Sequence, residues 1–387
     1  MELIEPELEA IRRELRAFTD RAVAPQAEER DREQRLEPEV VRELARARLL
    51  VPELASARGG RDFSAAALGL LMEELGRTCS SVRSLVTVHG MVAHVIARWG
   101  SPAQRDTWLS RLARGEWLGA LALSEPEIGS ALADVQTRAV RDGDDYVVTG
   151  TKQWITCGQL AEGFLLLAGS DAGPLTLLVR RGTPGLSIEP IQGMLGTRGS
   201  MLATLRLRAC RVPVAEAIGR PGMGLGWVAS AALDHGRFTV AWGAVGIAQA
   251  CLEAAVQHAT SRRQFGVPLI EHQLVRRMIS EITTEVRAAR LLCLHAARLR
   301  QAGHPDSVAE TSVAKHFAAR TAMRAAHDAV QVHGALGCSE QRSVQRHFRD
   351  AKIMEIIEGS NEMHQLHIAD LAVAEVAALA PQVHETP

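Results

Sequence analysis

The sequence lacks an excess of charge of either sign. Its 387 residues carry 44 lysines and arginines against 45 aspartates and glutamates, so the formal net charge at pH 7 is -1. Nucleic-acid-binding proteins draw much of their affinity from a basic surface. The short cluster of Arg206, Arg208 and Arg211 lies on an alternating pattern in which arginines face water. The composition gives no argument for nucleic acid as a partner, although an acidic protein could dock on a local patch.

Paired cysteines and metal-ligand motifs are also absent. No Cys-x-x-Cys pair occurs among the six cysteines, which are Cys79, Cys157, Cys210, Cys251, Cys293 and Cys338. The 14 histidines include no His-Glu-x-x-His, and His364 with His367 is an isolated pair. A disulfide framework or a zinc site is therefore not indicated. The pattern fits a reducing compartment, and we expect a cytoplasmic protein without a metal.

Long hydrophobic runs are missing as well. No segment reaches the roughly 18 apolar residues that a membrane span needs. The N-terminal stretch from Met1 to Pro6 is acidic and has no positive region followed by an apolar run. We expect no membrane partner and no targeting signal.

The hydrophobic pattern changes period twice along the chain. Residues 1–117 read as an N-terminal all-α domain, with apolar residues such as Leu8, Ile11 and Leu15 at helical spacing. Residues 118–222 alternate with period two, and Asp142-Gly143 marks a hairpin, which predicts a small β-barrel or sandwich. We take the β-barrel as the prediction for this middle domain.

The chain is helical again over 223–387. Long periodic segments at about 228–259, 269–302 and 307–335, joined by short connections, predict a C-terminal four-helix bundle. No Gly-x-Gly-x-x-Gly follows a strand, so a Rossmann site is not supported. The fold class is α+β multidomain, with three domains.

The most informative carboxylate is Glu358, which lies at a break between two helical segments. Gly359 is a good helix stop, and Ser360 or Asn361 is a good cap for the next helix. Apolar residues of that next helix, from Met363 to Ala377, predict a stripe packed on the body of the protein. A carboxylate at such a break is partly desolvated, which raises its pKa and makes it a usable base. The alternative is an ordinary helix-end glutamate with its head in water.

Two further stretches resemble known signatures. Leu121 to Ser130 (LALSEPEIGS) and Lys152 to Thr156 (KQWIT), followed far downstream by Ile357 to Ser360 (IEGS), resemble the flavin-binding and catalytic segments of the acyl-CoA dehydrogenase family. The order and intervals are similar over nearly the whole chain. The resemblance implies FAD as the cofactor and Glu358 as the base that removes the α-proton of an acyl thioester, while the flavin takes the hydride.

The resemblance also implies a set of cofactor contacts. Ser124 would lie near the pyrimidine end of the flavin and Thr156 near N5, and Trp154 would stack there unless it is only a large barrel residue. Several of the contacts would reach the cofactor of a neighbouring subunit, so a homodimer or homotetramer is implied. The full set is Leu121, Leu123, Ser124, Gly129, Ser130, Trp154, Ile155, Thr156, Arg262, Gln264, Phe265, Gln273, Gln331, Val332, Gly334, Ala335, Ser360 and Glu362. Ala131 and Ala335 depart from the family pattern and could loosen the flavin.

The resemblance assigns substrate contacts to a smaller set, Ser130, Gly236, Arg237, Trp242 and Gly359. Gly236 stands where some relatives carry their base, so Glu358 has no competitor. Trp242 and Phe238 would either close an acyl tunnel to short groups or face the bundle core. Arg237 would pair with a polar substrate group or serve the structure.

Finer similarity links the segments Thr78 to Met91, Val240 to Ile247 and Ala351 to Ser360 to acyl-carrier-protein dehydrogenases that help make hydroxymalonyl and methoxymalonyl units for polyketides. We therefore expect a short acyl group on a carrier protein, in polyketide or antibiotic biosynthesis. The alternatives are a short-chain acyl-CoA dehydrogenase passing electrons to an electron-transfer flavoprotein, an oxygen-using oxidase, and an inactive helical scaffold.

Overall fold

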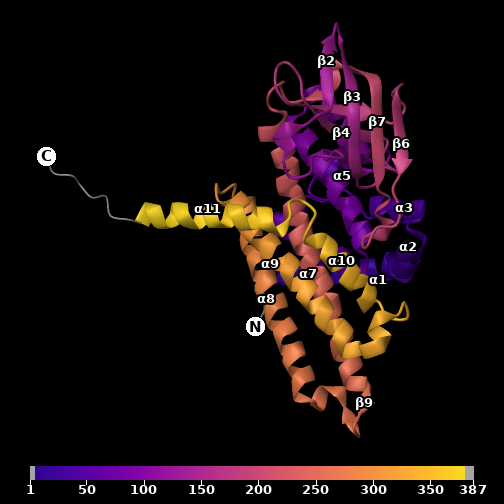
Figure 1. The fold of residues 1–387 in the computed structure, drawn as a ribbon, viewed down its shortest axis with the longest axis vertical. Helices are drawn as coiled ribbons and strands as arrows, with labels where there is room; N and C mark the ends of the chain where they lie inside the picture. The colour runs from indigo at the N-terminus through magenta and orange to yellow at the C-terminus, as the bar shows by residue number, and fades with distance from the viewer. Residues whose placement is uncertain (1–4, 380–387) are drawn as a thin grey trace, which may run out of the picture.

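The structure is a computed structural model, and it describes residues 5–379. Helices form the two ends of the chain and strands form the middle (Figure 1). The N-terminal helices are α1 (Pro6–Ala22), α2 (Ala27–Glu33), α3 (Pro38–Arg46), α4 (Ala65–Thr78), α5 (Ser80–Trp99) and α6 (Pro102–Ala113).

Local sequence explains where these helices begin. Proline occupies the first turn of α1, α3 and α6, where its missing N–H costs nothing. The Ser64 side chain accepts a hydrogen bond from the Ala67 N–H at the start of α4. At α6, Ser101 and Gln104 form a reciprocal capping box. The predicted apolar face of α1 is confirmed, since Leu15 and Phe18 are buried.

The middle region forms two four-stranded sheets, in the orders β1-β4-β5-β8 and β2-β3-β7-β6. The strands are β1 (Gly119–Ala122), β2 (Arg138–Asp142), β3 (Asp145–Ile155), β4 (Gly163–Ala168), β5 (Leu175–Arg180), β6 (Leu186–Pro190), β7 (Ala203–Pro213) and β8 (Ala217–Ile218). Over the described residues the sheets do not join into a closed barrel, so the β-barrel prediction is wrong in that respect.

A shared core holds the two sheets together as a sandwich. Phe164 and Leu166 of β4 belong to the same buried cluster as Tyr146 and Val148 of β3. Period-two alternation specifies such a half-buried face equally well in a barrel and in a sandwich, which is why the sequence could not separate them. The predicted hairpin is confirmed: β2 and β3 are antiparallel neighbours, joined across Gly143 at φ +62°.

Up to residue 379, the C-terminal region is built on five α-helices and a small hairpin. They are α7 (Ser230–Ser261), β9 (Arg263–Gln264), β10 (Val267–Pro268), α8 (Gln273–Gln301), α9 (Ser307–His333), α10 (Val344–Met354) and α11 (Asn361–Leu379). A π-helical turn, Gly224–Ala229, leads into α7. The combined helix Gly224–Ser261 meets the length and hydropathy of a membrane span, but 72% of its most apolar window is buried in the protein. It is the central helix of the helical core.

The N-terminal and C-terminal helices share one hydrophobic core. Leu68 and Leu75 of α4 lie in the same buried cluster as Val240 and Ala244 of α7. The sandwich keeps a separate cluster of its own. The two helical regions therefore act as a single body against which the sandwich is placed, above them in Figure 1.

The helix α11 does not pack as predicted. It projects away from the other helices (Figure 1), and Leu366 and Val373 are 60% and 70% exposed. The start of the expected apolar stripe is partly covered, because the first turns of α11 contact α9 and Met363 is half-buried, but Leu366 and Val373 are left uncovered by the other described residues. The start of the helix is as expected, because the Ser360 hydroxyl accepts a hydrogen bond from the Met363 N–H at 3.4 Å.

Candidate active site

Glu358 lies in the irregular turn between α10 and α11. Its backbone is left-handed, with φ +56°, and Gly359 follows with φ +94°. A non-glycine residue in this region is strained unless its surroundings hold it. Two cations do so: the Arg237 Nε donates to the Glu358 carbonyl at 3.2 Å, and the Lys315 Nζ donates to the Gly359 carbonyl at 2.7 Å. The turn is thus tied to α7 and α9.

The Glu358 carboxylate points at the surface of α7. A Cβ added to Gly236 would lie 2.5 Å from Glu358 Oε2 and 2.7 Å from the Met91 methyl carbon. Only glycine at position 236 therefore leaves room for this carboxylate. Glu358 as a residue is half-buried, but Oε2 itself is buried and has no hydrogen-bond partner among the described residues.

This burial sets the protonation of the carboxylate. Desolvation raises the pKa of Glu358 to about 7, against the opposing effect of Arg237, Arg83 and Lys315. A carboxylate with that pKa is available as a base near neutral pH. The alternative that Glu358 has its head in water does not describe this structure.

The segments expected to hold the flavin meet on the sandwich. The Gln153 N–H donates to the Ser124 carbonyl at 2.9 Å, which joins the loop after β1 to the end of β3. The Lys152 Nζ donates to the Leu123 carbonyl and to Glu125, both at 2.8 Å. Burial lowers the pKa of Lys152 to about 8, with Glu125 opposing. This buried ion pair fixes the loop on the strand.

Trp154 stands out at this junction. It occupies an irregular stretch of β3, has φ +63°, and is 49% exposed. Its indole is therefore not a packed sandwich residue, and it offers an apolar face beside the partly exposed Ser124 and Thr156. These residues fit an aromatic ring system with polar edges. Leu123 and Ile155 are buried in the protein, so they would meet a ligand only through their backbone.

The remaining positions of this set are spread around the site. Leu121 is partly buried, whereas Gly129 and Ser130 are exposed on the loop. Ser360 caps α11 beside Glu358, and Glu362 is exposed in the first turn of α11. The structure brings these residues to the same end of the molecule as Glu358 or to the neighbouring sandwich.

The other expected cofactor contacts lie far from Glu358. At about 1.5 Å per residue, about 24 Å of helix separates Lys315 from Gln331 on α9. Val332, Gly334 and Ala335 follow Gln331. At the same end of the bundle the ring of His333 stacks on that of His258, 4.3 Å apart, near the end of α7.

The loop after α7 carries the rest of this distant group. Arg262 follows α7, Gln264 is in β9, and Gln273 begins α8. Phe265 has φ +51° and is 94% exposed. One chain therefore does not bring the two groups of residues together.

Trp242 lies in the helical core. It is fully buried, packs against Gly69 of α4, and meets Phe238 edge-on with ring centroids 6.4 Å apart. The structure thus realises the second of the two alternatives for Trp242, and the tunnel-closing alternative is not what these contacts describe. Arg237 has the structural role already given, through its bond to the Glu358 carbonyl.

Sequence reasoning missed three side chains at the site. Lys315 and Arg83 are buried cations that depress the pKa of Glu358, and Met91 lies beside its carboxylate. A usable signal existed for the first two, since each is a single cation within a stretch of small and apolar residues. Cations in such stretches must be buried or displaced, and buried cations need a partner.

A second buried carboxyl was also missed. Both oxygens of Glu53 are buried without a hydrogen-bond partner among the described residues, and desolvation raises its pKa to about 7. His235 Nε2 lies 3.8 Å from Glu53, and the ring of His94 stacks on that of His235. Because Glu53 and Glu358 both have a pKa of about 7, the titration of either group could appear in a pH–rate profile.

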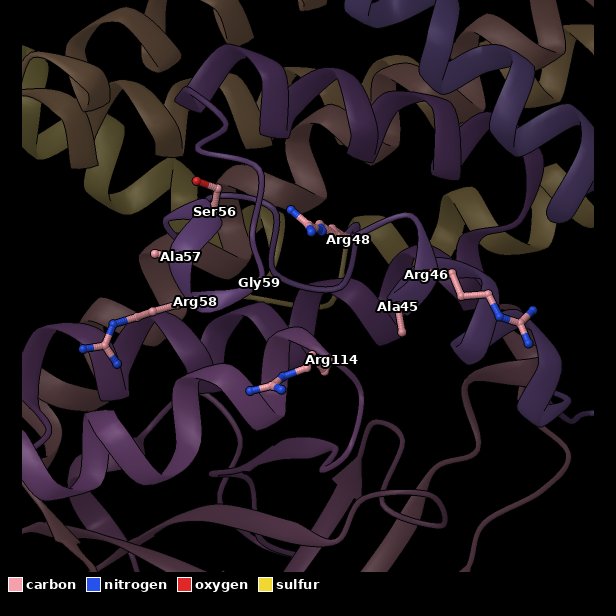
Figure 2. A pocket seen from close by; sticks show the side chains of 8 residues that line it. All are labelled: Ala45, Arg46, Arg48, Ser56, Ala57, Arg58, Gly59 and Arg114. Atoms are coloured by element: carbon pink, nitrogen blue, oxygen red, sulfur yellow. The ribbon is translucent and has the colours of Figure 1, made fainter.

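A surface hollow lined by arginines is not part of this site. Figure 2 shows it between α3, the loop before α4 and the end of α6, with Arg46, Arg48, Arg58 and Arg114 around it. Arg46, Arg58 and Arg114 are paired with exposed carboxylates. No residue assigned above to the flavin, the substrate or catalysis lines the hollow.

Comparison with known proteins assigns nearly the whole chain to one family. The descriptions "Acyl-CoA dehydrogenase" N-terminal, middle and C-terminal domain match residues 5–116, 120–210 and 222–372. The human mitochondrial short-chain specific acyl-CoA dehydrogenase is 34% identical over 92% of this chain and 87% of its own. The chain belongs to the acyl-CoA dehydrogenase family.

Two solved structures extend this result. A glutaryl-CoA dehydrogenase from Mycobacterium smegmatis in complex with FADH2 has a TM-score of 0.92 and 31% identity, with 96% of each chain covered. FkbI, described for biosynthesis of the methoxymalonyl extender unit of the polyketide immunosuppressant FK520, has a TM-score of 0.86 and 37% identity, covering 92% of this chain and 98% of that one. The protein is accordingly a flavin-dependent oxidoreductase of acyl thioesters, with FAD as its cofactor.

Proposed function

We propose that this protein oxidises a short acyl thioester carried on an acyl carrier protein, in polyketide or related secondary metabolism. The likeness to FkbI over nearly the whole chain supports this substrate class. The human short-chain relative supports the second candidate, a dehydrogenase of short acyl-CoA esters. We also infer a cytoplasmic location, in keeping with six free cysteines.

The proposed chemistry rests on Glu358, whose Oε2 is buried without a hydrogen-bond partner among the described residues and whose pKa burial raises to about 7. Glu358 removes the α-proton of the thioester and holds it on its carboxylate. Bound FAD supplies the acceptor for the hydride that leaves the β-carbon. The electron pair left at the α-carbon forms the new carbon–carbon double bond, so protons and electrons balance.

The neighbouring residues prepare Glu358 for this step. Arg237 and Lys315 fix the left-handed turn through its two carbonyls, which aims the carboxylate across Gly236. Met91 excludes water on one side. The N–H of Glu358 would donate to the thioester oxygen as negative charge develops there.

The cofactor site is completed by a second copy of the chain. The distant group, Arg262 to Phe265 with Gln331 to Ala335, is separated from Glu358 by most of the length of α9. Phe265, Leu366 and Val373 are large apolar side chains exposed in one chain. A homodimer or a dimer of dimers would cover them and bring the distant group to a partner's flavin.

The test is to record the flavin absorbance of the purified protein under anaerobic conditions. Matching three- and four-carbon acyl groups are offered on CoA and on carrier protein, and products are identified by mass spectrometry. We expect carrier-bound esters to bleach the flavin and CoA esters to react far more slowly. Bleaching by CoA esters alone at micromolar concentration would overturn the carrier-protein proposal and favour the second candidate.

The same preparation distinguishes the electron acceptor. We propose an electron-transfer flavoprotein as the acceptor, which is supported by the likeness to a solved structure described under the electron transferring flavoprotein of Acidaminococcus fermentans. Adding it should restore the yellow colour after bleaching. Hydrogen peroxide release during aerobic turnover would instead identify oxygen as the acceptor.

A further inference from the structure

Two tryptophans meet at the surface where α5 ends and α7 begins. Trp227 belongs to the π-helical turn before α7 and is 58% exposed, and its ring lies edge-on to that of Trp99, with centroids 5.7 Å apart. The guanidinium carbon of Arg98 lies 5.4 Å from the centre of the Trp99 ring. An isolated exposed apolar residue is ordinary. An exposed indole that packs against a second ring, itself covered by a cation, is held in place to contact a partner.

The surroundings of these rings are basic. Arg105 lies in the first turn of α6, and Arg220 is exposed in the turn before the π-helix. The Gln104 side chain donates to the Ala217 carbonyl at 2.9 Å, which brings the start of α6 next to the chain that leads to Arg220. Among the described residues no carboxylate lies within 4.0 Å of Arg98, Arg105 or Arg220. Three cations therefore surround the indole without a counter-charge.

The carboxylates of this region are mostly paired already. Asp106 pairs with Arg58 at 3.1 Å, and Asp234 pairs with Arg300. Asp171 is an exposed acid in the turn between β4 and β5, and that turn contacts the loop before the π-helix. Three unpaired cations against one acid give this surface a positive excess, which attracts a negatively charged partner.

This surface lies at the outer end of the α5–α7 pair. The two helices run antiparallel, since Gly90 lies against His235 and Trp99 against Trp227. Gly236, under the Glu358 carboxylate, follows Trp227 by nine residues, or about 13 Å along the axis at about 1.5 Å per residue. We name these surface residues the Trp227 patch: Arg98, Trp99, Arg105, Arg220 and Trp227.

The α5–α7 interface between the Trp227 patch and Glu358 is polar. The ring of His94 stacks on that of His235, with centroids 5.0 Å apart, and His235 Nε2 is buried without a hydrogen-bond partner among the described residues. Burial lowers the pKa of His235 well below its ordinary value, so its imidazole is neutral. Buried polar atoms normally have a partner. A ligand arm that contains amide groups can supply one, whereas an alkyl chain cannot.

We propose that the Trp227 patch docks the acyl carrier protein, with the exposed indole as the apolar anchor and the three arginines facing an acidic surface of the carrier. The inference rests on the proposed function and names the surface that recognises the carrier. Tryptophan and arginine are the residues that most often dominate the binding energy of a protein interface. A phosphopantetheine arm of about 14 bonds at about 1.3 Å each spans about 18 Å. A carrier held at the patch therefore reaches Glu358.

The test separates docking from chemistry. The same short acyl group is offered on the carrier protein and on free pantetheine, and anaerobic flavin bleaching gives kcat and KM for each. The wild type should prefer the carrier-bound ester by about tenfold or more in kcat/KM, because only this ester contacts the patch. Trp227→Ala and Arg98→Glu should each lower kcat/KM for the carrier-bound ester by about 30-fold, mainly through KM. Both variants should oxidise acyl-pantetheine as the wild type does, which also shows that they are folded.

Salt gives a second measurement. Added salt should raise KM for the carrier-bound ester in the wild type, and it should do so less in Arg98→Glu, because exposed charges are screened. Arg13→Glu is the matched control. Arg13 is exposed on α1, and the neighbouring Arg16 pairs with Glu253 near the far end of α7. This variant should keep kcat/KM for both esters within about twofold.

Three results would overturn the inference. The first is a wild type that oxidises acyl-pantetheine as fast as the carrier-bound ester. The second is an equal loss with both esters in Trp227→Ala. The third is smaller species of Trp227→Ala in sedimentation, which would assign the patch to a second copy of the chain. In each case bleaching by acyl-pantetheine would leave the dehydrogenase function standing, whereas the proposed function itself would fail if no thioester bleached the flavin.

Discussion

The two ends of the long helices α7 and α9 are built in opposite ways. At the Glu358 end, a strained turn is held by Arg237 and Lys315, and one carboxylate oxygen is buried without a partner among the described residues. At the other end, Phe265 is 94% exposed in a short hairpin. At the first end one chain alone provides the catalytic carboxylate, whereas at the second end one chain leaves apolar side chains exposed. Mutations at the first end should therefore affect catalysis, and mutations at the second should affect assembly.

The largest effect should come from Glu358→Gln. Removing a positioned general base costs about 10²- to 10⁴-fold in rate, while the amide keeps the shape of the side chain. Flavin reduction by the best thioester is the measurement, and the bound FAD should stay near one per chain. Glu29→Gln, at an exposed residue of α2 with no assigned role, is the control and should stay within about twofold. A Glu358→Gln protein with a tenth of the wild-type rate would argue against this role.

The next effect should come from Gly236→Ala. The added methyl would collide with the Glu358 carboxylate and with Met91, so the carboxylate must move. A displacement of this size should lower kcat/KM by about 10- to 100-fold with the fold retained. Gly226→Ala is the matched control, because its Cβ meets nothing within 4 Å. Equal activity of the two variants would show that the carboxylate does not need this position.

At the opposite end, Phe265→Asp should act on assembly. A charge placed in an apolar interface opposes burial, so sedimentation should show smaller species and the purified protein should lose FAD on dilution. Melting of the single chain should change little, since the side chain is exposed. Val140→Asp, at a residue 57% exposed on the sandwich, should change neither assembly nor FAD content. If Phe265→Asp assembles as the wild type does, this end of the bundle does not lie in the subunit interface.

The smallest effect concerns stability and pH. Burial raises the pKa of Glu358 from its ordinary 4.5 to about 7, so ionising it in the folded protein is unfavourable. The destabilisation is absent below pH 4.5, grows as the pH rises, and is complete above about pH 7. Glu358→Gln should therefore raise Tm by a few degrees at pH 8 and much less at pH 5. A shift that is equal at both pH values would contradict a buried, ionising carboxylate.

Much of this organisation was predictable from the chain. Periodicity separated helices from strands, and the Asp142-Gly143 turn marked its hairpin, because these signals are local. The closure of a barrel depends on pairing between distant strands, which alternation does not encode. The prediction that α11 packs on the body of the protein was wrong at Leu366 and Val373 for a related reason. An apolar stripe shows that a helix face must be covered, but it does not show which chain covers it.

The site residues also divide into those that local sequence could predict and those that depend on packing between distant elements. The break at Glu358 and the Trp154 segment could be found because they interrupt regular patterns and resemble a known family. Arg83 and Lys315 went unassigned, because their importance comes from burial and from missing counter-charges. Those properties arise only when α5, α7 and α9 are packed together.

The most direct test of the account is the pH dependence of flavin bleaching at low thioester concentration, which reports the free enzyme. It should be measured for the wild type, Glu53→Gln and Glu358→Gln, because both carboxyls have a pKa of about 7. The wild type and Glu53→Gln should show a rate that rises to a plateau with an apparent pKa of about 7, and Glu358→Gln should lose both the rise and the rate. A Glu358→Gln protein that keeps the rise, or a Glu53→Gln protein that loses it, would contradict Glu358 as the base.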